Sequence, residues 1–303
     1  MIFKNNNKIA NIYRGTLPIS NVYRGGILVY TGEKPITYDG LTFEALEPST
    51  IKYTPSTVST AQYSYDTVNW ETADNVTLNL NKGKKVFFKG TITGNQTNSN
   101  YAKFTMTGNI SASGSIMSLQ AGNPEDNTLN YNYEFYRIFY GCTSLVASPV
   151  LPATTLTEDC YEFMFDGCTS LVTEPELPAT TLSAYCYSGM FQNCSALVFP
   201  PYLPATTLTD GCYWHMFSGC TSLIEAPELL ATTLTEECYI WMFKDCSNLN
   251  YIKALFTTTP DITYTQNWVQ GVAPTGTFVK NKDATWDVIG VDGIPEGWTV
   301  ETA

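Results

Sequence analysis

All nine cysteines of the chain follow one 26-residue spacing. Spacing this regular predicts repeated coils that stack side by side, so that each residue lies next to its counterpart in the following coil. The cysteines are then expected to form ladders through the stack, not a cluster around a metal ion or a substrate. One series is Cys142, Cys168, Cys194, Cys220 and Cys246, and the other, eight residues earlier, is Cys160, Cys186, Cys212 and Cys238.

Leucine and phenylalanine repeat with the same spacing. One coil cannot bury these side chains alone, whereas stacking covers them all. Burying one such side chain is worth about 1.5–3 kcal/mol, so each added coil gains stability before its ordering entropy is subtracted. The predicted ladders are Leu145, Leu171, Leu197, Leu223 and Leu249; Leu151, Leu177, Leu203, Leu229 and Leu255; and Phe139, Phe165, Phe191, Phe217 and Phe243.

Within one coil the pattern predicts a short helix followed by a strand. Thr157 is a residue type that caps helix N-termini, and the carboxylates of Glu158 and Asp159 would favour the first turn. Gly167 would end the helix, and the strand is expected over residues 170–174. The apolar side chains that would share one helical stripe are Cys160, Met164, Phe165 and Cys168.

Other zones flank the repeats. Residues 35–123 contain about seven short segments of alternating polarity, which predict an Ig-like β-sandwich. Residues 1–34 hold a duplicated strand-like segment that ends each time in glycine. The expected fold class is mixed β with short helices. It comprises a β anchor segment over 1–34, the sandwich over 35–123, a solenoid of about five coils over 124–255 and a C-terminal cap over 256–303.

The chain carries few charges and is acidic. Charged residues make up 15% of it and the net charge is −12, which disfavours a nucleic-acid partner. No apolar stretch approaches the roughly 20 residues of a membrane span, and the start lacks the apolar core of an export signal. We therefore expect no membrane insertion and no export by a signal peptide. Free thiols are favoured, although coils about 5 Å apart leave disulfides geometrically possible.

The repeat resembles a known class of proteins. The sequence Phe-x-Gly-Cys-Thr-Ser-Leu, at 165–171 and 217–223, resembles the BspA-like class of leucine-rich repeats. The Leu-Pro-Ala-Thr-Thr-Leu linker, first seen at 151–156, looks like a variant common in gut bacteria and their bacteriophages. The resemblance covers most of residues 36–303. It implies a leucine-rich-repeat solenoid that serves in adhesion and needs no cofactor.

The duplication near the N-terminus is a second resemblance. Ile-Tyr-Arg-Gly at 12–15 and Val-Tyr-Arg-Gly at 22–25 look like leading segments of phage structural proteins, which dock an appendage onto the virion. This implies a location on the virion surface and contact with other virion proteins through residues 1–34. A homo-oligomer is expected by analogy with such appendages. The candidate docking residues are Tyr13, Arg14, Tyr23 and Arg24.

Catalytic and metal chemistry is not favoured. His215 is the single histidine, and its position in other coils holds arginine, phenylalanine, glycine or tryptophan, a variability typical of a surface position. A catalytic triad built on it is therefore not expected. The cysteines lack the close pairing of a zinc site. Paired carboxylates such as Glu158 and Asp159 are explained by the start of a helix. We expect no enzyme, no metal site and no cofactor.

Ligand contact is expected where the repeat varies. Aromatic rings beside carboxylates offer flat faces for sugar rings and acceptors for hydroxyl groups. The alternative is that Trp214 and Trp241 pack on each other or on a neighbouring subunit, since aromatic patches often mark protein interfaces. The candidate ligand-binding residues are Phe163, Phe199, Tyr202, Trp214, His215, Trp241 and Tyr251.

These observations predict a structural and adhesive component of a bacteriophage virion, a fibre or decoration protein. It would dock by its N-terminus and present the repeats to a glycan or protein of the host surface. The alternative is a bacterial cell-surface leucine-rich-repeat adhesin, which would need an export route. A weaker alternative is an enzyme that degrades surface polysaccharide, with candidate acids Glu174, Glu176, Glu225 and Glu228.

Overall fold

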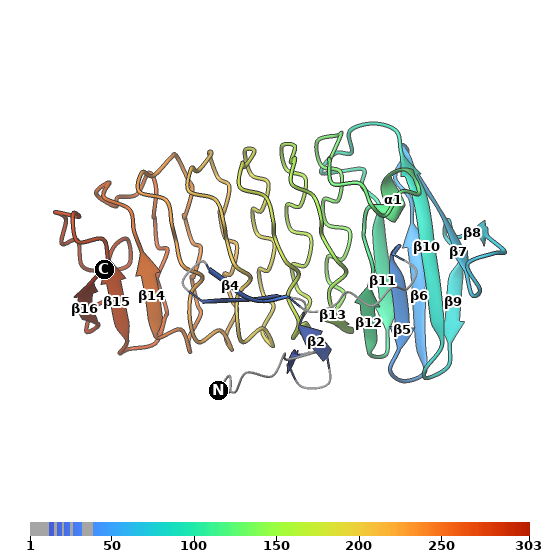
Figure 1. Cartoon of the computed structure of the whole chain (residues 1–303), viewed down its shortest axis with the longest axis horizontal. Helices are drawn as coiled ribbons and strands as arrows, with labels where there is room; N and C mark the ends of the chain where they lie inside the picture. Colours follow the sequence, from blue (N-terminus) through green and yellow to red (C-terminus); the bar gives the residue numbers. More distant parts are fainter. Residues whose placement is uncertain (1–11, 15–16, 20, 25–26, 32–38) are drawn as a thin grey trace. The chain divides into compact units, whose positions relative to one another are not determined.

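The structure, a computed structural model, describes residues 12–14, 17–19, 21–24, 27–31 and 39–303 (Figure 1). The chain consists of two compact units, residues 1–38 and residues 39–303, each with most of its contacts within itself. The only α-helix in the described ranges is α1 (Ser118–Ala121), which has four residues. The described residues are thus mostly β with almost no helix, which agrees with the predicted mixed β class at this coarse level.

The described part of the first unit consists of short antiparallel strand pairs. Tyr13 and Arg14 lie in β1, and Tyr23 and Arg24 lie in β3. The rest of the predicted docking segment 1–34 lies partly outside the described residues, and the docking role stays a prediction. The pairs are β1 (Ile12–Arg14) with β2 (Leu17–Ile19), and β3 (Asn21–Arg24) with β4 (Ile27–Thr31).

The second unit begins with two sheets that pack on each other where the sequence predicts a β-sandwich. The rings of Phe43, Phe88 and Phe104 join the two sheets, with centroids 5.0–5.5 Å apart. The six-stranded sheet has the order β13 (Leu145–Ala147), β12 (Ile110–Ser113), β5 (Thr42–Ala45), β10 (Lys85–Ile92), β7 (Ser59–Ser64) and β8 (Glu71–Thr72). The three-stranded sheet has the order β11 (Lys103–Thr107), β6 (Ser49–Thr54) and β9 (Thr77–Leu80).

The two sheets continue directly into the first coil. β12 pairs in parallel with β13, and β13 belongs to that coil. The N–H of Phe104 donates to the carbonyl of Ile138 at 2.7 Å, and the ring of Phe104 stacks on Phe139 with an interplanar angle of 13°. The sheets thus cover the apolar end of the first coil, which would otherwise face water.

Beyond β13 the chain forms coils that lie side by side (Figure 1). Alternate N–H groups of a coil donate to carbonyls 25 residues ahead, as from Phe139 to Met164 at 3.0 Å. The predicted phenylalanine ladder is present from Phe139 to Phe243, with centroids 5.5–5.8 Å apart and planes within 10°. A tyrosine ladder that the sequence analysis missed runs beside it through Tyr161, Tyr187, Tyr213 and Tyr239.

The prediction of a short helix in each coil is wrong. Residues 158–167 form consecutive turns, in which the N–H of Glu162 donates to the carbonyl of Asp159, three residues back. The backbone is left-handed at every fourth residue, with φ of 56° at Asp159, 51° at Phe163 and 76° at Gly167. A turn that repeats every four residues buries nearly the same side chains as a helical stripe. It also leaves alternate N–H groups free to donate hydrogen bonds to carbonyls of the next coil.

The predicted cap and strand of the coil are also wrong. The hydroxyl of Thr157 donates to the carbonyl of Tyr131 in the preceding coil at 2.6 Å, so it links two coils and caps no helix. The strand expected over 170–174 is reduced to one bridge between Ala147 and Thr173. Adjacent coils are therefore joined mainly by the hydrogen bonds of their turn segments, and not by a continuous β-sheet.

The cysteine ladders are present, and all nine thiols are free and buried. The Sγ of Cys168 donates to the carbonyl of Phe139, 29 residues earlier, at 3.2 Å. Burial raises the pKa of every one of these thiols, so they stay protonated donors. Equivalent bonds of 3.0–3.1 Å are donated by Cys194, Cys220 and Cys246.

Residues 256–303 stack on the last repeat as additional coils. The N–H of Phe243 donates to the carbonyl of Trp268 at 2.8 Å. Trp268 is fully buried, and its ring contacts both Tyr239 and Phe243, so one indole covers the ends of both aromatic ladders. The parallel sheet at this end contains β14 (Tyr251–Ala254), β15 (Thr277–Lys280) and β16 (Thr299–Thr302).

Candidate functional site

Four of the predicted ligand-binding residues form one row of aromatic side chains, here named the aromatic row: Phe163, Trp214, His215 and Trp241. The ring of His215 lies 4.2 Å from that of Trp214 and 4.4 Å from that of Trp241. Phe163 contacts Trp214 with centroids 6.4 Å apart. All four side chains are half-buried and come from three coils, so the row runs along the stack.

A glycine allows the aromatic row to cross one coil. Gly189 occupies the position of Phe163 in the next coil, and a Cβ added there would overlap the ring carbons of Phe163. The ring therefore lies over Gly189 and reaches Trp214 in the coil after it. With φ of 56°, Gly189 also has a left-handed backbone that glycine adopts at little cost.

His215 contributes a flat neutral ring to the row. Burial, followed by the charge of Lys244, lowers its pKa to about 4, so the imidazole is uncharged at pH 7. Its Nδ1 is buried and has no hydrogen-bond partner among the described residues. Trp214 and Trp241 also contact each other, at 5.9 Å, as the alternative interpretation of these residues required. The arrangement offers an aromatic surface for stacking.

Positive charge lies near both ends of the aromatic row. The guanidinium carbon of Arg137 is 4.9 Å from the ring centroids of Phe163 and Tyr140. At the other end, the Nζ of Lys244 is 5.8 Å from the Trp241 ring. Such cation–π contacts are worth about 0.5–2 kcal/mol each, so they help to fix the side chains of the row.

The remaining three candidates lie in another part of the coil. Phe199 and Tyr202 are half-buried and follow the leucine ladder, and Tyr251 is 36% exposed in β14. The aromatic row lies in the turn segment that precedes this ladder. The same stretch as Phe199 exposes one aliphatic side chain per coil at Val172, Val198 and Ile224.

A polar hollow of about 340 Å³, here named the acidic hollow, adjoins the start of the row. Tyr136, one of its lining residues, contacts the ring of Phe163 with centroids 6.5 Å apart. Sequence analysis missed this feature because it assigned Glu158 and Asp159 to a helix. The lining residues are Asn98, Tyr133, Tyr136, Glu158, Asp159, Glu162 and Tyr185.

The carboxyl groups of the acidic hollow are crowded. Burial and the neighbouring charge of Asp159 raise the pKa of Glu162 to about 7, and burial raises the pKa of Asp159 itself. Glu162 accepts a hydrogen bond from the hydroxyl of Ser188 at 3.3 Å. Within the described part of the chain, no ion pair reaches Glu158, Asp159 or Glu162.

A second glycine positions the tyrosine at one side of the hollow. A Cβ on Gly211 would overlap the ring of Tyr185, so this ring lies across the coil that contains Gly211. The hydroxyl of Tyr185 then donates to Glu237, two coils ahead, at 2.6 Å. Tyr185 is thus held in the lining of the hollow by a hydrogen bond to a residue two coils ahead.

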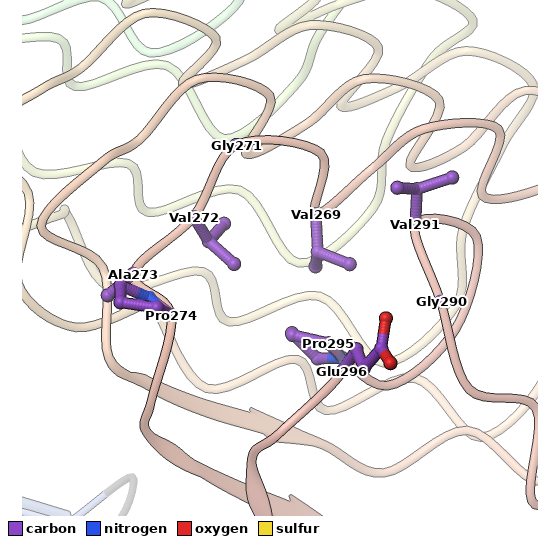
Figure 2. Close-up of a pocket in the computed structure, with 9 residues that line it drawn as sticks. All are labelled: Val269, Gly271, Val272, Ala273, Pro274, Gly290, Val291, Pro295 and Glu296. Atoms are coloured by element: carbon purple, nitrogen blue, oxygen red, sulfur yellow. The ribbon is translucent and has the colours of Figure 1, made fainter.

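A smaller apolar hollow lies among the C-terminal coils (Figure 2). Its volume is about 170 Å³, below the roughly 300–1,000 Å³ of typical ligand sites. Figure 2 shows the side chains of Val269 and Val272 on one segment facing Pro295 on another. It contains none of the predicted site residues.

Two other kinds of site are absent from the part of the chain that the structure describes. In the described ranges, no group of three or more His, Cys, Asp or Glu side chains is arranged to hold a metal ion. None of the helices there has the length and apolar character needed to span a membrane.

Comparisons with models of protein families, with curated proteins and with solved structures found no match to this chain. The aromatic row and the acidic hollow are therefore the basis for a functional assignment.

Proposed function

We propose that this chain is an adhesive, non-enzymatic component of a bacteriophage virion, a fibre or decoration protein. In this proposal residues 1–34 dock to other virion proteins, and the coils present a binding face to a glycan or protein of the host surface. The coils would be a BspA-like leucine-rich-repeat solenoid. The 26-residue repeat and the hydrogen bonds that link residues 25 apart support that assignment.

The aromatic row is the observation that supports adhesion most directly. Large aromatic rings supply much of the binding energy at interfaces. Here four rings from three coils form one continuous set of contacts, and Gly189 leaves room for Phe163 within it. A histidine that is neutral at pH 7 and lies between two indoles favours stacking over acid–base chemistry.

Two observations support docking through the N-terminal segment. Residues 1–38 form a compact unit separate from 39–303. Residues 1–40 carry five Lys or Arg against one Glu and one Asp, whereas the whole chain has a net charge of −12. The two units would thus meet different partners. A homo-oligomer would present several aromatic rows at once, and multivalency would strengthen weak individual contacts.

Docking is tested by deleting residues 1–34 in the phage that carries this chain. The truncated protein should remain soluble, and purified particles should lack it. If the truncated protein still joins the particle, the docking segment is wrongly assigned. Detection of the full chain on the envelope of uninfected bacteria would instead favour the adhesin.

Adhesion is tested with the substitutions Trp214→Ala and Trp241→Ala. Binding of the purified protein to host cells should fall at least about tenfold, because aromatic anchors commonly contribute 2 kcal/mol or more. Val300→Ala, which changes an exposed residue of β16, is the matched control. Unchanged cell binding in both tryptophan variants would exclude the row as the adhesive surface.

A further inference from the structure

We infer that the Trp241 end of the aromatic row binds an acidic sugar, with the pyranose ring on the indole and its anionic group beside Lys244. The inference rests on the proposed function, because it names the class of glycan that the row would hold. It also gives the site a direction, in which the acidic sugar lies at Trp241 and uncharged sugars extend toward Phe163.

Lys244 is a base without an ion pair in an acidic region. Residues 124–255 contain three Lys or Arg against 15 Asp or Glu. One of the three bases, Lys253, pairs with Glu228 at 2.7 Å. Within the described part of the chain no carboxylate forms an ion pair with Lys244, and its Nζ lies 5.8 Å from the centroid of the Trp241 ring. A positive charge placed in this way attracts an anionic group on a ligand that stacks on the indole.

The carboxylate closest to Lys244 in the sequence is held elsewhere. A Cβ added to Gly271, in the next coil, would lie 2.6 Å from the Oδ1 of Asp245. The carboxylate of Asp245 therefore lies over the backbone of Gly271, where a side chain at that position would otherwise project. It leaves the charge of Lys244 available to a ligand.

The next coil contributes amides to this end of the row. The N–H of Trp241 donates to the carbonyl of Gln266 at 2.9 Å, and the N–H of Asp245 donates to the carbonyl of Gln270 at 2.7 Å. Residues 266–270 thus run beside the segment that holds Trp241, and none of them is charged. Amide side chains both donate and accept hydrogen bonds, as the hydroxyl groups of a sugar require.

The opposite end of the row disfavours an anion. The acidic hollow adjoins Phe163 there, and the carboxyl groups of Glu158, Asp159 and Glu162 line it. The charge of Arg137 offsets part of this negative charge. An anionic group at Phe163 would be repelled by the remaining carboxylates, whereas one at Trp241 would be attracted by a lysine. The charges therefore set the direction in which the sugar chain lies.

The test compares two sugars of the same ring shape by NMR titration of the full, tag-free chain at pH 7 and low salt. Methyl β-D-glucuronide has a carboxylate where methyl β-D-glucoside has a hydroxymethyl group. His215 is the single histidine and lies 4.4 Å from the Trp241 ring, so its ring signals report binding at this end of the row. The glucuronide should shift these signals saturably and bind about fivefold more tightly than the glucoside. Added salt should reduce that difference.

Controls separate the charge from the ring. Lys244→Gln removes the charge and nearly keeps the length of the side chain, so it should weaken glucuronide binding to the level of the glucoside and leave glucoside binding unchanged. Lys282→Gln, at a lysine that is 70% exposed in the C-terminal coils, is the matched control and should bind as the unaltered chain does. Trp241→Leu should weaken binding of both sugars. Sodium acetate, which has the charge and lacks the ring, should cause no saturable shift.

Glucose 6-phosphate distinguishes the sources of the anionic group. Affinity comparable to that of the glucuronide indicates any anionic sugar, and weaker affinity indicates a sugar carboxylate. The inference fails if the two glycosides bind equally, if acetate alone reproduces the shift, or if Lys244→Gln leaves the affinity for the glucuronide unchanged. It fails as well if neither glycoside shifts the His215 signals saturably up to about 50 mM.

The outcome is separable from that of the proposed function. If Lys244→Gln does not fold, the comparison of the two glycosides on the unaltered chain decides. Binding of Trp214→Ala and Trp241→Ala to host cells tests the adhesive role of the row by itself. A row that binds both glycosides equally would retain that role and lose only the preference for an acidic sugar.

Discussion

Because Phe163 lies directly over Gly189, adding a single methyl group at position 189 should have a measurable effect. In Gly189→Ala the new Cβ would overlap the ring of Phe163, so this ring has to leave its place. The contact between Phe163 and Trp214 would be lost with it. Gly141→Ala is the matched control, because Gly141 has φ of 69° and no atom within 4 Å of the added Cβ.

The expected magnitudes differ between the two variants. Both place alanine in a left-handed backbone, which costs about 1–2 kcal/mol. Gly189→Ala also exposes part of a phenylalanine ring and removes an aromatic contact, worth about 0.5–1.5 kcal/mol by itself. We therefore expect Gly189→Ala to lower the free energy of unfolding by about 1–3 kcal/mol more than Gly141→Ala.

Urea unfolding of the two variants and the unaltered chain measures this difference. Tryptophan fluorescence should also change in folded Gly189→Ala, because Trp214 loses a neighbouring ring, and it should stay unchanged in Gly141→Ala. Equal destabilisation within about 0.5 kcal/mol would refute the argument, since that is the ordinary scatter of independent sites.

Three further predictions concern the core. The nine buried thiols should not react with a thiol reagent at pH 8 and should all react in guanidinium, and rapid labelling of the folded chain would contradict the ladder. Burial raises the pKa of Glu134 to about 7, above the unfolded value near 4.5, so this group stabilises the fold fully below pH 4.5 and loses that contribution as the pH rises through 7. Its Oε1 has no partner among the described residues, so Glu134→Gln, which resembles the protonated form, should flatten the stability profile measured by urea unfolding between pH 5 and 7.5. Trp268→Ala should cost about 3–5 kcal/mol in thermal or urea unfolding, because it uncovers both aromatic ladders, whereas Trp241→Ala should cost about 1 kcal/mol; similar costs would show that Trp268 does not close the stack.

The repeat in the sequence was sufficient to predict which residues meet across coils. Residues at 26-residue intervals, such as Phe165 and Phe191, stack as expected because the structure has the same period. The conformation within a coil could not be predicted in this way. Buried side chains at Cys160, Met164 and Cys168 fit a helical stripe and a chain of four-residue turns equally well, since 3.6 and 4.0 differ little over eight residues.

Each coil has three left-handed backbone positions, and the sequence indicates only one of them. The third left-handed position of each coil holds Gly, Asn or Asp, which tolerate that conformation. The other two hold bulky residues such as Tyr133, Phe163 and Trp241, which propensity alone would not place there. The acidic hollow was missed for the same reason, because Glu158, Asp159 and Glu162 converge only when the helix is replaced by turns.

Gly189 and Gly211 each leave room for a ring from the preceding coil, so the order of the coils cannot be changed without steric overlap. Excising residues 177–202 removes one 26-residue unit and would restore the apolar ladders in register. Phe163 would then face His215 where it now has the bare backbone of Gly189. Excising residues 203–228 would similarly bring Tyr185 onto Glu237 in place of Gly211. The coils are therefore alike in their cores but differ at specific surface positions. Removing or reordering coils would require new substitutions at the positions that follow Phe163 and Tyr185 by one repeat, which Gly189 and Gly211 now occupy.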